Sequence, residues 1–314
     1  MRALITGGSG RVGAELVPLL VDQGWDVRVL QRGDSYQLPA ATSGIEVMSG
    51  SVADRATAHA AVADVDVVCH LAALMPPFDN DQLFETNVRG SFNLLEAIRQ
   101  SAKRPALVYA STDATYGTGL SDRPYPEPIA ESTAPRPTNF YGVTKVASER
   151  IISDYCRLYA LNFLIVRYCW VFRAAEVLEL FALQTWDEFL SDSQRREVAE
   201  LPDPVPALFD EDGKPFSDHI IDARDAARAT ALALAQTGWS CEAVNICGPA
   251  PFRYVDHSPH VARALGRPLV ELELDGFHAY ALDTTKAEQL LGFRADYDLT
   301  AMIRETIPNY MPEA

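Results

Sequence analysis

The chain has 314 residues, enough for one large domain or two modest ones with a substantial hydrophobic core. Its formal net charge of −16 argues against nucleic acid or an anionic membrane surface as a partner, because both are themselves negatively charged. A run of about 18 apolar residues is absent from the sequence, which excludes a transmembrane helix.

The five cysteines are an odd number without a Cys-x-x-Cys pair, so they indicate neither a disulfide framework nor a zinc site. The apolar run after the first methionine is too short for a signal peptide. These features predict a cytoplasmic protein that binds no metal.

Strands and helices alternate along the first half of the chain. Strands are predicted over 2–6, 26–30, 45–48, 65–70, 105–111 and 162–168, and helices over 11–23, 53–63, 80–102 and 140–160. Strands separated by helices indicate a parallel, doubly wound sheet of the α/β class. Pro18, inside the first helix, predicts a kink or a local break there.

A glycine-rich turn joins the first strand to the first helix. It contains Gly7, Gly10 and Gly13 in the spacing Gly-x-x-Gly-x-x-Gly, rather than the more usual Gly-x-Gly-x-x-Gly. A glycine pattern by itself is equally typical of an ordinary tight turn. Its place between a buried strand and a helix favours a dinucleotide pyrophosphate site, because the backbone N–H groups at a helix N-terminus face anionic phosphates.

The end of the second strand bears on which dinucleotide binds. An NAD site commonly has an acidic residue there that bonds the ribose hydroxyls, whereas this chain has Gln31 and Arg32. A neutral amide beside an arginine favours the 2′-phosphate of NADP, and Arg11 in the glycine turn adds a second positive charge. NADP is therefore the predicted cofactor, with NAD as the alternative.

Tyr141 and Lys145 stand four residues apart in the predicted helix 140–160, so the ammonium can lie beneath the phenol. A nearby cation favours phenolate and lowers the tyrosine pKa from its usual value of about 10. The pair predicts a general base that takes a proton from an alcohol while a hydride leaves the same carbon.

The regular alternation ends near residue 170. A long helical stretch is predicted over 174–199, followed by a proline-rich segment over 201–206 and shorter elements to the C-terminus. We expect a dinucleotide-binding domain over 1–170 and a mainly substrate-binding lobe over 171–314, with some elements of the second half returning to the sheet.

In their order along the chain, these motifs resemble the extended short-chain dehydrogenase/reductases, the group that contains nucleotide-sugar epimerases and dehydratases. The resemblance covers nearly the whole chain. The segments that carry it are the glycine turn, His70-Leu-Ala-Ala73, Asn87, Ser111-Thr112, Tyr141 with Lys145, and Arg167. It implies a Rossmann-type doubly wound sheet with a smaller C-terminal substrate-binding lobe, and a homodimer formed through the helices that bear Tyr141 and Asn87.

The resemblance also implies roles for individual residues. Tyr141 exchanges a proton with the substrate oxygen, and Lys145 lowers its pKa. Thr112 donates a hydrogen bond to the reacting oxygen, supported by Ser111. The implied cofactor-binding residues are Gly7, Gly10, Arg11, Val12, Gly13, Gln31, Arg32, Ser51, Val52, Leu71, Ala72, Ala73, Asn87, Tyr141 and Lys145.

Substrate contacts are expected from Asp113, Ala114, Arg167 and His219, although His219 is equally well explained as a plain hydrogen-bonded histidine. Two departures from the family pattern limit the substrate. Nucleotide-sugar enzymes usually have an arginine early in the segment 216–225 that holds the substrate pyrophosphate, but this chain has Ser217 or Asp218 there. A carboxylate would repel a diphosphate, so a substrate without a nucleotide diphosphate is expected.

The second departure is Ala114, which replaces the glutamate of the 4,6-dehydratases, so dehydration is not expected. The sequence therefore predicts an NAD(P)-dependent oxidoreductase that acts on a secondary alcohol or ketone of a sugar-like substrate. A net dehydrogenase or reductase is favoured over an epimerase that keeps NAD bound, because both the acidic residue and the pyrophosphate arginine are missing. A non-catalytic dinucleotide sensor is a third hypothesis, but a sensor has no need of Thr112, Tyr141 and Lys145 together.

Overall fold

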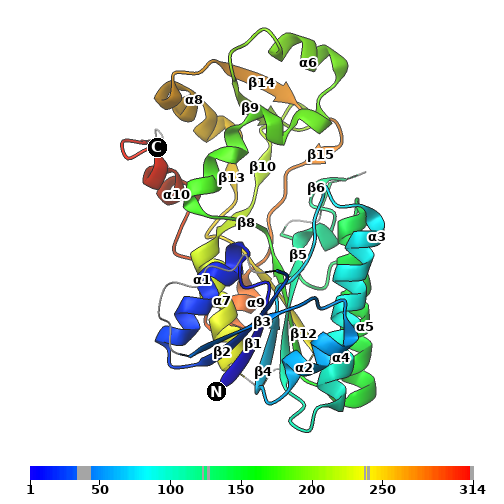
Figure 1. Cartoon of the computed structure of the whole chain (residues 1–314). Coiled ribbons are helices and arrows are strands. Elements are labelled where there is room, and N and C mark those ends of the chain that lie inside the picture. Colours follow the sequence, from blue (N-terminus) through cyan, green and yellow to red (C-terminus); the bar gives the residue numbers. More distant parts are fainter. Residues whose placement is uncertain (34–43, 122–123, 126–127, 237, 239–240, 312–314) are drawn as a thin grey trace.

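The computed structural model describes residues 1–33, 44–121, 124–125, 128–236, 238 and 241–311. Within these ranges, a seven-stranded sheet forms the centre of the molecule in the order β12-β7-β5-β4-β1-β2-β3 (Figure 1). Every neighbouring pair is parallel. The strands are β1 (Arg2–Thr6), β2 (Asp26–Gln31), β3 (Ile45–Ser49), β4 (Val67–His70), β5 (Ala106–Thr112), β7 (Phe163–Tyr168) and β12 (Glu242–Ile246).

This arrangement confirms the predicted doubly wound α/β fold. All six predicted strands are present, with bounds that shift by at most two residues. The sequence patterns did not locate β12, which comes from the second half of the chain and extends the sheet beside β7.

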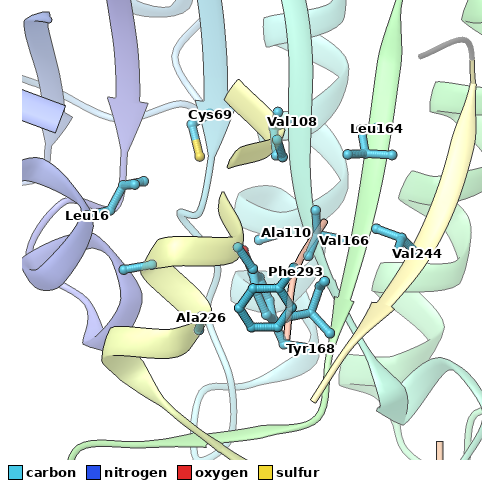
Figure 2. Packing of buried hydrophobic residues seen from close by; sticks show 14 of the residues in the cluster. Leu16, Cys69, Val108, Ala110, Leu164, Val166, Tyr168, Ala226, Val244 and Phe293 are labelled. Carbon is cyan, nitrogen blue, oxygen red and sulfur yellow. The ribbon is translucent and has the colours of Figure 1, made fainter. Parts of the chain in front are cut away.

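Helices cover both faces of the sheet. The helices α1 (Arg11–Asp22), α7 (Ala223–Ala235) and α9 (Thr285–Leu291) pack on one face, and α2 (Arg55–Val62), α4 (Gly90–Gln100) and α5 (Phe140–Tyr159) pack on the other. Figure 2 shows the first face, where Leu16 and Ala226 point toward strand residues such as Val108 and Val166. Because helices cover both faces, the central strands β1, β4, β5 and β7 are buried almost throughout, whereas the edge strand β3 is largely exposed.

The predicted helix over 80–102 is a continuous helical path in three parts. These are α3 (Asn80–Leu83), a π-helical segment η1 (Phe84–Arg89) and α4. The local break predicted at Pro18 does not occur, since α1 continues through it. Pro18 is exposed, so the carbonyl that loses its N–H partner lies on the solvent side of the helix.

The prediction of a long helix over 174–199 is wrong. The segment forms three 3₁₀ helices, η3 (Ala174–Phe181), η4 (Leu183–Thr185) and η5 (Asp187–Phe189), and one short α-helix, α6 (Asp192–Val198). Its buried apolar side chains are Ala174, Val177, Leu180, Phe181, Trp186, Leu190 and Val198. The spacing of Ala174, Val177 and Phe181 also suits an α-helix, so the apolar pattern by itself does not predict 3₁₀ turns.

The remaining elements form a second lobe above the carboxyl edge of the sheet (Figure 1). Its paired strands are β9 (Val205–Phe209) with β14 (Leu269–Glu273), and β10 (Ser217–Asp218) with β13 (Phe252–Arg253). They pack with α8 (Tyr254–Leu265) and α10 (Leu299–Thr306) around a separate apolar core.

Two short strand pairs and one turn lie where the lobe meets the sheet. They are β8 (Trp170–Phe172) with β11 (Ile220–Asp222), β6 (Gly119–Leu120) with β15 (Phe277–His278), and the 3₁₀ turn η2 (Asp113–Thr115) directly after β5. The lobe therefore covers the strand ends at which parallel α/β sheets bind ligands. Across the described ranges, every helix falls short of the length or apolarity that a bilayer-spanning segment needs.

Candidate active site

The turn between β1 and α1 lines a cavity of about 610 Å³ at the carboxyl edge of the sheet. Most of the residues predicted to bind the cofactor are in its wall. These are Gly7, Gly10, Gln31, Arg32, Ser51, Val52, Leu71, Ala72 and Ala73. The wall also includes Ser9, Leu30, Gly33, Gly50 and Thr86, which the sequence analysis did not single out.

The shape of the turn requires its glycines. Gly7 has a φ of +75°, and a Cβ added to it would lie 2.7 Å from the backbone nitrogen of Ala72. A Cβ on Gly13 would lie 2.4 Å from the carbonyl oxygen of Gly7. Gly10 begins α1 without a side-chain cap, so the backbone N–H groups of the first turn are not satisfied by a capping side chain. The turn therefore fits an anionic pyrophosphate, which such N–H groups bind.

The far end of the cavity fits a ribose. Gln31 ends β2 with only 8% of its surface exposed, and its Oε1 is a buried acceptor without a hydrogen-bond partner among the described residues. Its Nε2 donates to the carbonyl of Gly33, at 3.4 Å. A hydroxyl donor in the cavity would satisfy the orphaned oxygen, because a buried polar atom without a partner costs free energy.

Arg11 does not point into this cavity. Its Nε donates to Glu176 Oε2 at 2.7 Å, and its guanidinium lies 5.1 Å from the centre of the Phe172 ring. Arg11 therefore joins α1 to the second lobe, and the prediction that it adds positive charge at the ribose phosphate is wrong. Val12, next to it, is half-buried and packs against the sheet core.

Asn87 and His70 are buried residues whose hydrogen bonds stabilise the wall of the site. Asn87 accepts a hydrogen bond from the N–H of Leu74 at 2.8 Å and donates to Thr144 Oγ1 at 3.0 Å, so it joins the loop after β4 to α5. His70 is bonded through Nδ1 to Thr6 at 2.8 Å, and burial with the nearby charge of Lys145 lowers its pKa to about 3. His70 is therefore neutral.

Thr112, Tyr141 and Lys145 meet where β5 ends beside the start of α5. Asn139 caps α5 by accepting a hydrogen bond from the N–H of Gly142 at 2.8 Å. A Cβ on Gly142 would lie 2.6 Å from the carbonyl oxygen of Ala114, so this glycine lets α5 pack against the turn after Thr112. The fold therefore brings together the three residues that the sequence predicts to be catalytic.

Lys145 is fixed in place by the end of β5. Its Nζ donates to the carbonyl of Ala110 at 2.8 Å and lies 5.8 Å from the centre of the Tyr141 ring. Burial lowers the Lys145 pKa to about 8, although the carboxylate of Glu149 raises it. The group therefore remains mostly charged at neutral pH.

The pKa of Tyr141 shifts in the direction opposite to the prediction. Burial raises it well above the usual value, Tyr109 and Asp113 raise it further, and a hydrogen bond with Thr112 lowers it. The prediction of a lowered pKa considered Lys145 alone and did not include desolvation of the phenol, so it is wrong. The form of Tyr141 that the protein favours is the protonated phenol.

Ser111 and Arg167 belong to a buried network behind β5. Ser111 Oγ donates to Glu149 Oε1 at 2.5 Å. Arg167 donates to both oxygens of Glu149, at 2.9 and 2.6 Å, and to the hydroxyl of Tyr116 at 2.7 Å. Because neighbouring strand residues point to opposite faces, Ser111 is directed away from Thr112. This placement does not match the predicted substrate contact of Arg167 or direct support of Thr112 by Ser111.

Two further substrate predictions concern Ala114 and His219. Ala114 is half-buried, and its N–H donates to Thr112 Oγ1 at 3.2 Å. His219 Nε2 donates to the carbonyl of Gly248 at 3.0 Å, while its Nδ1 accepts from the N–H of Leu282 at 3.4 Å. His219 is buried with both ring nitrogens bonded to backbone, as the plain hydrogen-bonded alternative predicts.

Asp113 and Asp218 lie on the side of Thr112 that faces the second lobe. Thr112 Oγ1 donates to Asp113 Oδ1 at 3.1 Å, and the hydroxyl of Tyr280 contacts both carboxyl groups. Throughout the described part of the chain, no group of three or more His, Cys, Asp or Glu side chains is placed to hold a metal ion.

The family model for the NAD-dependent epimerase/dehydratase family matches residues 3–247. The chain belongs to this family. It is thus an enzyme of the extended short-chain dehydrogenase/reductase type, as the order of motifs predicts. A putative UDP-glucose 4-epimerase from Methanocaldococcus jannaschii is 27% identical over 98% of this chain and 97% of its own length. The dTDP-glucose 4,6-dehydratase of Mycobacterium tuberculosis is 33% identical, but over 52% of this chain and 51% of its own length.

Among solved structures, a short-chain dehydrogenase/reductase superfamily protein from Agrobacterium tumefaciens with bound NAD has a TM-score of 0.84. It is 28% identical, and the match covers 98% of this chain and 96% of that protein. A structure of a UDP-galactose 4-epimerase has a TM-score of 0.73 with 26% identity, covering 98% and 97% of the two chains. These similarities extend over both lobes.

Glu149 and Tyr280 were not predicted from the sequence. Glu149 stands eight residues after Tyr141 and four after Lys145. This helical spacing places the three residues on one face of the helix, so it could have been used to predict Glu149. Tyr280 lies 167 residues from Asp113, and no local pattern indicates their contact.

Proposed function

We propose that this enzyme is a net dehydrogenase or reductase acting on a secondary alcohol or ketone of a sugar-like substrate. The observation that carries the proposal is the convergence of Thr112, Tyr141 and Lys145 at the sheet edge that also bears the glycine turn. A nicotinamide dinucleotide supplies the hydride donor or acceptor when bound. The residues of the chain orient the substrate oxygen and move its proton.

The electrostatics of Tyr141 favour the reductive direction. Its raised pKa keeps the phenol protonated, and a protonated phenol donates to the oxygen of a ketone as a hydride reaches the carbon. Lys145 remains beside the ring as a buried cation and stabilises the phenolate that this transfer leaves.

The charge of the substrate lobe supports a substrate without a diphosphate. Asp218 is 3% exposed and Asp113 is 7% exposed, and neither forms an ion pair with a Lys, Arg or His among the described residues. Placing a diphosphate near unpaired carboxyl groups is unfavourable. The relatives named for UDP-glucose and UDP-galactose make a nucleotide-sugar epimerase the second candidate.

NADP is the proposed cofactor. Gln31 carries no charge where a carboxylate would repel a 2′-phosphate, and Arg32 lies exposed in the same cavity wall. Because the orphaned oxygen of Gln31 also fits a free ribose hydroxyl, NAD is the alternative. The Agrobacterium relative contains NAD.

We also propose that residues 1–170 bind the dinucleotide, that residues 171–314 mainly shape the substrate pocket, and that the protein acts in the cytoplasm. A homodimer is supported by exposed apolar side chains on two neighbouring elements. Phe84 on η1 and Val143 on α5 are each 44% exposed. Burying such side chains against a second copy is favourable.

The dimer is tested by the mass in solution. We expect twice the mass of one chain, and a shift to the single-chain mass in Val143→Glu, because a buried unpaired carboxylate is costly. Leu269→Glu, which places the same charge on the second lobe at a position 42% exposed, is the matched control. A wild-type protein with the mass of one chain would contradict the proposal.

The choice of dinucleotide is tested with Arg32→Ala. If Arg32 binds a 2′-phosphate, its loss weakens NADPH binding by about tenfold or more, the effect of one charge-assisted hydrogen bond, and leaves NADH binding nearly unchanged. Fluorescence titration measures both constants. Arg11→Ala is the matched control, since Arg11 pairs with Glu176 and its loss affects both dinucleotides alike. Equal weakening of NADPH and NADH in Arg32→Ala would overturn the NADP assignment.

The catalytic role is tested with Tyr141→Phe. Turnover on a panel of free sugars, polyols and ketones is expected to fall by about 10²–10⁴-fold, the usual contribution of a general acid or base, while NADPH binding persists. Tyr155→Phe is the control on the same helix, because its hydroxyl bonds Glu96 of α4 rather than a residue of the site. Full turnover in Tyr141→Phe would contradict the proposed catalytic role of Tyr141. A wild-type protein without turnover on the whole panel would contradict the proposed net oxidoreduction.

A further inference from the structure

A chain of hydrogen bonds runs from the reaction centre into the second lobe. Thr112 Oγ1 donates to Asp113 Oδ1 at 3.1 Å. The hydroxyl of Tyr280 lies 3.3 Å from Asp113 Oδ2 and 2.6 Å from Asp218 Oδ1. Asp113, Tyr280 and Asp218 are 7%, 4% and 3% exposed, so solvent does not separate them.

The number of protons in this chain is constrained by Tyr280. Its hydroxyl carries a single hydrogen, which it can donate to one carboxyl group only. The shorter contact assigns that hydrogen to Asp218. If Asp113 were also ionised, its Oδ2 would face the lone pairs of the Tyr280 oxygen, and two buried negative charges would share one neutral hydroxyl. A proton on Asp113 Oδ2 removes this conflict, because Asp113 then donates to Tyr280.

Within the described ranges, the groups around the two carboxyls do not supply a countercharge. Asp113 accepts a further hydrogen bond from Thr118 at 2.8 Å, and Asp218 accepts one from the N–H of His219 at 2.7 Å. The ionisable neighbours that face the pair are phenols, a thiol and a buried neutral imidazole: Tyr125, Tyr141, Tyr254, Tyr280, Cys169 and His219. None of them is a cation at neutral pH.

We propose that Asp113 and Asp218 hold one proton between them through Tyr280, and that this proton sets the direction of the Thr112 hydroxyl. The shared proton does not depend on the function proposed above, whereas the effect on the Thr112 hydroxyl rests on it. Burial raises the pKa of both carboxyl groups, that of Asp218 to about 7, in agreement with the proton count.

The protonation of the pair changes what Thr112 offers to a substrate. When Asp113 is neutral, it attracts the Thr112 hydrogen only weakly, so Thr112 donates to the oxygen of a ketone. When the pair loses its proton, the Asp113 carboxylate holds that hydrogen in a charge-assisted bond, and Thr112 presents only lone pairs to the substrate. This second state suits an alcohol, whose hydroxyl can donate to Thr112. Asp113 and Asp218 therefore act as positioning residues that favour reduction at lower pH.

Infrared spectroscopy of the purified protein tests the shared proton without any substrate. With ¹³C-labelled aspartate, we expect the carbonyl band of a protonated carboxyl group at low pH, which disappears as the pH rises and the pair loses its proton. Asp113→Asn and Asp218→Asn should each remove it, because the remaining carboxylate then receives the Tyr280 hydrogen alone. Asp210→Asn is the matched control, since Asp210 is 6% exposed but bonded to backbone N–H groups.

A wild-type protein without the band would overturn the proposal, and this measurement does not depend on whether any variant folds. A band that is lost in only one of the two asparagine variants would place the proton on a single carboxyl group and would also overturn the sharing.

The role of Thr112 is tested by the pH profile of kcat/KM on a ketone and its alcohol from the panel. In the wild type, reduction should fall as the pair loses its proton. Asp113→Asn, which resembles the neutral state, should abolish this fall. If Asp113→Asn instead lowers kcat/KM equally at every pH, Asp113 is merely structural and the positioning role is overturned. Failure of the proposed function itself would appear as a lack of turnover with the infrared result intact.

Discussion

The buried ammonium of Lys145 is the interaction on which the site depends. A charge without contact to solvent must be paired or hydrogen-bonded, and Lys145 satisfies this through the carbonyl of Ala110 at 2.8 Å. That bond fixes α5 across the end of β5, which places Tyr141 beside Thr112. Glu149, one turn further along the helix, keeps the ammonium charged against the effect of burial. The placement of the proposed acid and its cation is thus a consequence of how one helix is held to one strand.

Two consecutive residues of β5 divide the site into a supporting side and a reacting side. Ser111 points to Glu149 and Arg167, whose buried ion pair anchors α5 to β7. Thr112 points to the opposite side, where Asp113 joins it to Tyr280 and Asp218 of the second lobe. The alternation of a β-strand separates an ionic network that holds the helix from a hydrogen-bonded chain that reaches the substrate lobe.

Features that depend on local patterns could be predicted from the sequence. The sheet strands of the first half and the helix bearing Tyr141 follow from apolar runs and caps, and the glycine turn follows from spacing. The segment 174–199 was predicted wrongly because its apolar spacing suits an α-helix, whereas the chain forms short 3₁₀ turns there. Apolar repeats of three and 3.6 residues differ little over a few turns.

Other failures come from contacts between distant parts of the chain. Arg11 pairs with Glu176, 165 residues away, and no local signal indicates that its charge is already neutralised. The pKa of Tyr141 depends on desolvation by residues that tertiary structure brings around it, so the i and i+4 spacing predicts the neighbour but not the direction of the shift. Burial and pairing of charges are the properties that the sequence leaves undetermined here.

The central claim is net oxidoreduction with a dinucleotide that exchanges at each turnover. The most direct test is to denature freshly purified protein and identify any released nucleotide by chromatography and mass spectrometry. We predict a protein without stoichiometric nucleotide that then binds NADPH more tightly than NADH. One NAD released per chain would contradict the claim, because a retained NAD is typical of an epimerase that returns the hydride to its own substrate.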